Sequence, residues 1–394
     1  MVNKYVGKKI ISEYQYYEFL AIDRPLTEDE IVELRMLSTR AVITPVSFTN
    51  HYNWGDFKGD PNKLMEHYFD AHVYVANWMT AIFMLRLPIE VLNEETVKEV
   101  SIPYILDFKA VKDYWVITWR LDESENYDRF GMEDGSGWMM RLAPVRYELL
   151  CGDLRSLYIG WLAAVSRGMI DDDEMEALPM CGLGNFTSAQ IALAEFLEVD
   201  PDLLGGAGIG SPVNPTEKLS EEDIDRWIEA LSRNEVKALI RQLLEGKGHQ
   251  AERIIKNRFA SLKRALQADS KSPLRRTVKK LHDNAGKARQ IRIEKERRDL
   301  ERLKARLRME REAYLKKLSV DFPKVWKSVA ETVKRGSGLA YDEACQMLVD
   351  ISEAYELLKG KQQFKKELRN FMADNIRRKA LIKRMEEAGI WKNK

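Results

Sequence analysis

The chain has 394 residues, 45% of them hydrophobic and 32% charged, a balance typical of globular proteins with two or three domains. Its three cysteines lie far apart and form no C-x-x-C pair, which argues against a disulfide framework and against a cysteine zinc site. The uncharged run at residues 71–85 is too short to span a membrane, and residues 1–19 lack the apolar run of a signal peptide. These features predict a protein of the reducing cytoplasm with no membrane partner.

The charges are distributed very unequally along the chain. Residues 1–250 carry 24 lysines and arginines against 42 aspartates and glutamates, a net charge of −18. Residues 251–394 carry 39 against 20, a net charge of +19. Such an asymmetry suggests that the basic half binds nucleic acid or an acidic partner. An alternative is that the two halves attract each other within one molecule.

The first 121 residues alternate between strand-like and helix-like patterns. Thr27 opens a capping box before one expected helix, and Asp60 and Pro61 begin a second. In the last expected strand, Trp115, Ile117, Trp119 and Leu121 share one face. We therefore expect an acidic α+β domain over residues 1–121, with helices and a mixed sheet. Its strands are expected at residues 16–23, 41–52, 80–87, 102–108 and 113–121. The proline in the strand at 41–52 places that strand at an edge or a bulge of the sheet.

Residues 122–137 are acidic and contain glycines, which is typical of a loop. Strand patterns stop beyond this loop, and residues 138–204 are expected to form a helical extension of the first domain. The glycines of the segment 182–197 suggest a phosphate-binding loop, but the P-loop lysine is missing, so Thr187 or Ser188 is interpreted as a helix cap. The glycine-rich residues 205–219 are expected to be a linker.

A helical domain, basic from residue 251, is expected over residues 220–394, with one long helix at about 284–318. In that helix Ile293, Leu300, Leu307 and Tyr314 recur every seven residues. The companion positions of a coiled coil are mostly charged, being Glu296, Leu303, Glu310 and Lys317. A long dimeric coiled coil is therefore not expected. We expect a mostly exposed helix that packs one narrow stripe onto its own domain and is supported by opposite charges four residues apart.

Cations gather just before and within the start of this helix, on a segment that Ser272 and Pro273 are expected to open. A row of cations along a helix is what phosphate-backbone binding requires. No helix-turn-helix, zinc-finger or RNP-type pattern accompanies the row, so docking onto an acidic protein surface is an equal alternative. The candidate nucleic-acid-binding residues are Lys271, Arg275, Arg276, Lys279, Lys280, Lys287, Arg289 and Arg292.

Three histidines and an aspartate gather in the N-terminal domain and suggest a metal site. These candidate ligands are His51, His67, Asp70 and His72. On a helix His67 and His72 would point in different directions, unlike the paired histidines of H-E-x-x-H, which favours a structural interpretation. No nucleophile-elbow motif is present, and the sequence predicts no catalytic residue and no cofactor.

Residues 135–165 and 182–204 resemble segments of an uncharacterised family of bacterial proteins, and residues 16–27 and 377–391 are similar to that family's ends. The resemblance spans most of the chain. It implies a bacterial cytoplasmic protein and carries over no catalytic residue.

Together these observations predict a non-enzymatic component of a larger intracellular assembly. Its basic helical half would contact DNA or RNA, and its acidic α+β half would contact other proteins. One alternative is a protein–protein scaffold that binds no nucleic acid. Another is a metal-dependent enzyme with a site in the N-terminal domain.

Overall fold

The computed structural model describes residues 14–53, 55, 57–122, 135–213, 221–248, 251–252, 254–256, 258–259, 261–262, 274–358 and 360–391. Contacts within the chain divide it into two compact units, residues 1–292 and 293–394. Among the described helices, none combines the length and the apolar character that crossing a membrane requires.

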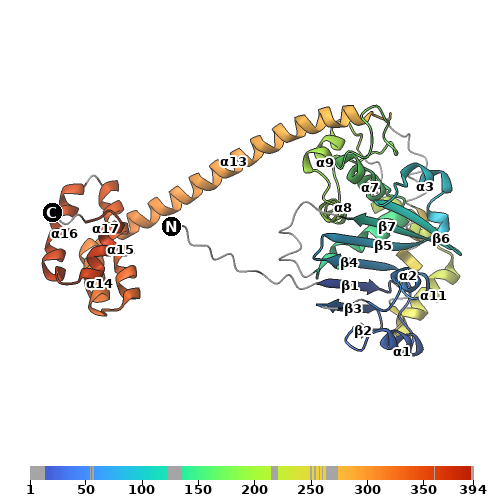
Figure 1. Ribbon diagram of the computed structural model, residues 1–394, viewed down its shortest axis with the longest axis horizontal. Helices are drawn as coiled ribbons and strands as arrows, with labels where there is room; N and C mark the ends of the chain where they lie inside the picture. Colours follow the sequence, from blue (N-terminus) through green and yellow to red (C-terminus); the bar gives the residue numbers. More distant parts are fainter. Residues whose placement is uncertain are drawn as a thin grey trace. The chain divides into compact units, whose positions relative to one another are not determined.

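A seven-stranded sheet forms the centre of the first unit (Figure 1). The strand order is β2-β3-β1-β4-β5-β7-β6, and every neighbouring pair is antiparallel. The strands are β1 (Gln15–Leu20), β2 (Val42–Thr44), β3 (Ser47–Tyr52), β4 (Ala71–Ala76), β5 (Thr80–Pro88), β6 (Leu106–Val111) and β7 (Tyr114–Leu121).

The expected mixed sheet is therefore wrong. Every pair of neighbouring strands is antiparallel, so the sheet contains none of the parallel pairs that a mixed sheet would have. The single strand expected at 41–52 is a hairpin, because Pro45 and Val46 form the turn between β2 and β3. The sheet also contains β4, which the sequence patterns did not predict.

Helices cover both faces of the sheet, so the first unit has three layers. One face packs against the later helices, as the alternation in β7 predicts: the core there contains Trp115, Ile117, Trp119 and Leu121. The later helices are α5 (Trp138–Leu142), α6 (Pro144–Leu150), α7 (Arg155–Ser166), α8 (Ser188–Phe196) and α9 (Pro201–Gly208). Val116 lies in the core of the opposite face, which α1 (Glu28–Leu37) and α2 (Pro61–His67) cover. The first unit also contains α3 (Glu94–Val100), α10 (Glu221–Glu229) and α11 (Arg233–Leu244).

Four helix starts agree with the local sequence signals. Thr27 and Thr187 each accept a hydrogen bond from the backbone amide three residues later, and the side chain at that position bonds back in a capping box. Ser232 caps α11 in the same way. Asp60 accepts from the amide of Asn62 at the start of α2. Each cap satisfies amides that the first helical turn leaves without a carbonyl partner.

The long helix α13 (Val278–Leu318) begins on the first unit. Val278, Leu281 and Asn284 are buried there. A Cβ on Gly206 would lie 2.5 Å from the backbone nitrogen of Ala285, so only glycine permits α9 to approach α13 this closely. Residues 205–208, expected to begin a linker, are thus the end of α9 and part of a helix contact, and residues 214–220 lie outside the described residues.

The second unit is a helical bundle that contains the rest of α13 with α14 (Phe322–Lys334), α15 (Gly338–Leu357), α16 (Lys361–Asn375) and α17 (Lys379–Glu387) (Figure 1). The side chains of Leu348, Ile351, Phe364, Leu368 and Leu381 belong to its core. These positions follow helical spacing, which is why the sequence indicated helices here.

The middle of α13, residues 295–310, is exposed at every position. Leu300, Leu303 and Leu307 keep 51%, 45% and 52% of their surface exposed, so the narrow stripe expected to pack onto its own domain does not do so here. Ion pairs along the helix, such as Arg298 with Glu294 and Arg306 with Glu310, support this exposed section as predicted.

Candidate nucleic-acid interface

Several of the predicted nucleic-acid-binding cations form contacts within the first unit. Arg276 is largely buried, and its guanidinium pairs with the buried carboxylate of Glu176 at 2.6 Å. Arg292 contacts both carboxylate oxygens of Asp202, at 2.7 and 2.9 Å, and Arg289 lies 4.0 Å from the same carboxylate. Arg275 pairs with Glu99. These four arginines therefore help to attach the start of α13 to its own unit.

The other members of the predicted strip remain exposed. Lys279, Lys280 and Lys287 form no ion pair within the described residues. Lys280 and Lys287 lie on one side of α13, and Asp283 lies between them, three residues after the first and four before the second. Lys271 lies outside the described residues. The strip is thus less continuous and less basic than the sequence pattern suggested.

A second basic surface lies on α16, and the sequence reasoning did not select it. We call it the α16 face. It comprises Gln362, Gln363, Lys365, Lys366, Arg369 and Asn370, which surround a shallow surface hollow. All six side chains are exposed, whereas Phe364, Leu368, Phe371 and Met372 of the same helix are buried.

The three cations of the α16 face form no ion pair within the described residues. The carboxylate that lies among them in sequence, Glu367, accepts hydrogen bonds from Tyr355 and Gln363 instead of pairing with a cation of the described residues. This differs from α13, where most cations have a carboxylate three or four residues away. The second unit as a whole carries 26 lysines and arginines against 17 aspartates and glutamates. The sequence signal for the face was the spacing of Lys365, Lys366 and Arg369 opposite the apolar residues of α16.

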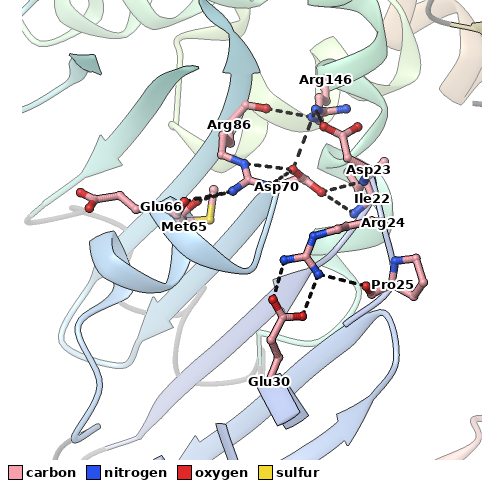
Figure 2. A network of polar contacts seen from close by, with 10 residues as sticks. All are labelled: Ile22, Asp23, Arg24, Pro25, Glu30, Met65, Glu66, Asp70, Arg86 and Arg146. Carbon is pink, nitrogen blue, oxygen red and sulfur yellow. Dashed lines mark hydrogen bonds and ion pairs between the residues drawn. The ribbon is translucent and has the colours of Figure 1, made fainter. Parts of the chain in front are cut away.

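The structure does not gather the four residues considered as metal ligands in the first unit into one cluster. Asp70 is buried, and Figure 2 shows its carboxylate between Arg86 and the backbone of residues 22 and 23. Its Oδ1 accepts hydrogen bonds from Nε and Nη2 of Arg86, at 3.1 and 2.7 Å. Its Oδ2 accepts from the amides of Ile22 and Asp23, at 2.7 Å each. Both oxygens are therefore occupied.

Further polar contacts extend this network (Figure 2). Arg146, also buried, donates to Asp23 at 2.8 Å and to the carbonyl oxygen of Arg86 at 2.9 Å. Arg86 also donates to the carbonyl oxygens of Met65 and Glu66 at the end of α2, at 3.2 Å each. The network joins the segment after β1 to α2, β5 and α6, which indicates that Asp70 has a structural role.

The histidines are also separated from one another. His51 on β3 and His67 at the end of α2 are exposed, whereas His72 on β4 is buried. Among the described residues, no three side chains of the His, Cys, Asp or Glu type are arranged to hold a metal ion. His72 lies beside a cavity of 200 Å³, smaller than most ligand pockets. The hydroxyl groups of Tyr17 and Tyr74 at this cavity already donate to Gln15.

His72 gives the first unit a predicted pH dependence. Burial lowers the pKa of His72 to about 3, against the weaker raising effect of its hydrogen bond to the Glu18 carbonyl. Between pH 3 and pH 6.5 the unfolded chain therefore binds a proton that the folded chain excludes, so stability falls as the pH falls. We expect His72 to account for a loss of about 2 kcal/mol of unfolding free energy between pH 7 and pH 5.

Denaturant unfolding of the wild type and of His72→Phe at these two pH values measures this contribution. The variant should lose less stability on acidification, whatever its absolute stability. His67→Gln, at an exposed histidine, should keep the wild-type pH dependence. Equal acid sensitivity of His72→Phe and the wild type would contradict the assignment.

Comparisons with protein-family models, with curated proteins and with solved structures gave no match for this chain. The resemblance noted from the sequence segments is therefore not supported by them. The surfaces described above carry the functional argument alone.

Proposed function

We propose that this protein is a non-enzymatic component of a larger intracellular assembly, and that its basic helical unit contacts the phosphate backbone of a nucleic acid. The acidic first part of the chain would contact other proteins. The observation that carries the proposal is the α16 face, where three exposed cations have no carboxylate partner among the described residues and are flanked by three amide side chains.

Cations without internal partners favour binding to a polyanion. An arginine already paired with a carboxylate has to give up that contact before it binds a phosphate. Lys365, Lys366 and Arg369 carry no such cost, and each phosphate that they neutralise would release a condensed counterion. Gln362 and Asn370 at the borders of the face add hydrogen-bond donors of the kind that contact phosphate and sugar groups.

The test is fluorescence anisotropy with labelled DNA and RNA, on the full chain, at several salt concentrations. Substituting glutamine for Lys365, Lys366 and Arg369 together removes three charges while keeping good helix formers. We expect affinity to fall about 10- to 100-fold at low salt. The log–log salt slope should become shallower by about 2 to 3.

A matched control removes the same number of charges from the strip predicted at the start of α13. It substitutes glutamine for Lys279, Lys280 and Lys287, and we expect nearly wild-type binding. The opposite result, with loss only in this control, would move the contact to α13. If the wild type binds neither DNA nor RNA, the proposal fails and the protein–protein scaffold becomes the better explanation.

A further inference from the structure

A groove lies beside the α16 face, between α14 and α16. It is lined by Pro323, Trp326 and Lys327 of α14 and by Asn370, Phe371 and Asp374 of α16. Its volume of 460 Å³ falls within the range of small-ligand pockets. Asn370 belongs both to this groove and to the α16 face, so the two surfaces are continuous.

Trp326 supplies the aromatic surface of the groove. Its ring packs against two core rings, with centroid distances of 5.7 Å to Phe371 and 6.2 Å to Phe364. The side chain is only partly buried, so one part of the ring is supported by the core while another part borders the groove. A ring held in this way loses little conformational freedom when a flat group stacks on it.

The groove and the adjoining α16 face differ in charge, so they favour different parts of a ligand. The groove is lined by two carboxylates, Asp374 and Glu367, and by one cation, Lys327, so its net charge is negative and disfavours a phosphate inside it. Lys365 and Arg369, one helical turn apart on the adjoining face, attract phosphates instead. A ligand with an uncharged flat group and a neighbouring anionic backbone fits both surfaces at once.

We infer that the groove between α14 and α16 receives an unpaired nucleobase, so that this unit prefers single-stranded over duplex nucleic acid. The inference rests on the proposed function. In a duplex the bases are stacked on one another and their faces do not reach a groove of this kind. In a single strand each base has a free face for stacking on an aromatic side chain.

The experiment measures the affinity of three full-length proteins for a labelled single strand of thymidines and for a duplex of the same length. The proteins are the wild type, Trp326→Leu and Trp326→Phe. The wild type should bind the single strand more tightly than the duplex. Trp326→Leu should lose about tenfold in single-strand affinity, Trp326→Phe should recover most of it, and duplex binding should stay unchanged in both.

A second measurement does not depend on the folding of a variant. Single strands that carry 5-iodouracil are cross-linked to the wild-type protein by light, and the attached peptide is identified by mass spectrometry. Cross-links in residues 322–334 or 361–375 support the inference. Cross-links confined to other segments overturn it.

The outcomes separate this inference from the proposed function. One outcome is that single strand and duplex bind equally, that Trp326→Leu changes neither affinity, and that the substitutions on the α16 face weaken both. This outcome overturns the inference about the groove and keeps the proposed function. Absence of any binding by the wild type overturns both.

Discussion

Asp70→Ala should lower the unfolding free energy of the first unit by about 3–5 kcal/mol. The substitution leaves Arg86 buried without its counter-charge and leaves the amides of Ile22 and Asp23 without their acceptor. A buried charge that loses its partner is far more costly than the pair itself is stabilising, because the remaining ion is no longer compensated for its lost hydration. Amide hydrogen exchange of β4 and β5 in the full chain reports the change, since it reads the stability of this unit alone.

Glu66→Ala is the matched control for this prediction. Glu66 lies four residues before Asp70, and its carboxylate pairs with Lys109, whose side chain is 57% exposed. We expect this substitution to cost less than about 1 kcal/mol. The double variant Asp70→Ala, Arg86→Met should be more stable than Asp70→Ala alone, because it removes the unpaired charge. Equal costs for Asp70→Ala and Glu66→Ala would show that the network does not stabilise the fold.

Local signals in the sequence were sufficient for much of the secondary structure. The caps at Thr27, Asp60 and Ser232 involve residues at most three apart, so the sequence pattern contains both partners. The alternation of β7 was also readable, because a buried strand face repeats every second residue. Strand pairing was not readable in this way. The registers of β1 with β3 and with β4 join residues far apart in the chain.

The candidate site shows the same limit. Arg275, Arg276, Arg289 and Arg292 form a basic strip in sequence, yet their carboxylate partners lie about 90 to 180 residues away. No spacing rule detects such partners. The α16 face follows from local spacing, and it was overlooked because a count of charges does not distinguish paired from unpaired cations. Gly205 and Gly206 suggested a flexible linker, although here they permit close contact between two helices.

Glu176→Ala should release the start of α13 from the first unit. The Glu176 carboxylate accepts hydrogen bonds from Tyr158 at 2.5 Å and from the backbone and side chain of Arg276 at 2.6–2.8 Å. Burial, reinforced by this carboxylate, raises the pKa of Tyr158 well above its usual value. Alanine would leave Arg276 without its buried partner, at a cost of about 3–5 kcal/mol. Amide exchange in residues 276–288 should therefore accelerate strongly.

Asp172→Ala provides the control, because Asp172 contacts the same part of α13 from an exposed position. Its carboxylate lies 2.9 Å from Nδ1 of His282, and both side chains are about half exposed or more. Removing this contact should change the exchange of residues 276–288 little, since exposed pairs contribute at most about 1 kcal/mol. If amide exchange of residues 276–288 is as slow in Glu176→Ala as in Asp172→Ala, the result would show that the apolar burial of Val278 and Leu281 holds α13 in place. Faster exchange in Glu176→Ala alone would instead make the buried ion pair the attachment of the long helix to the first unit.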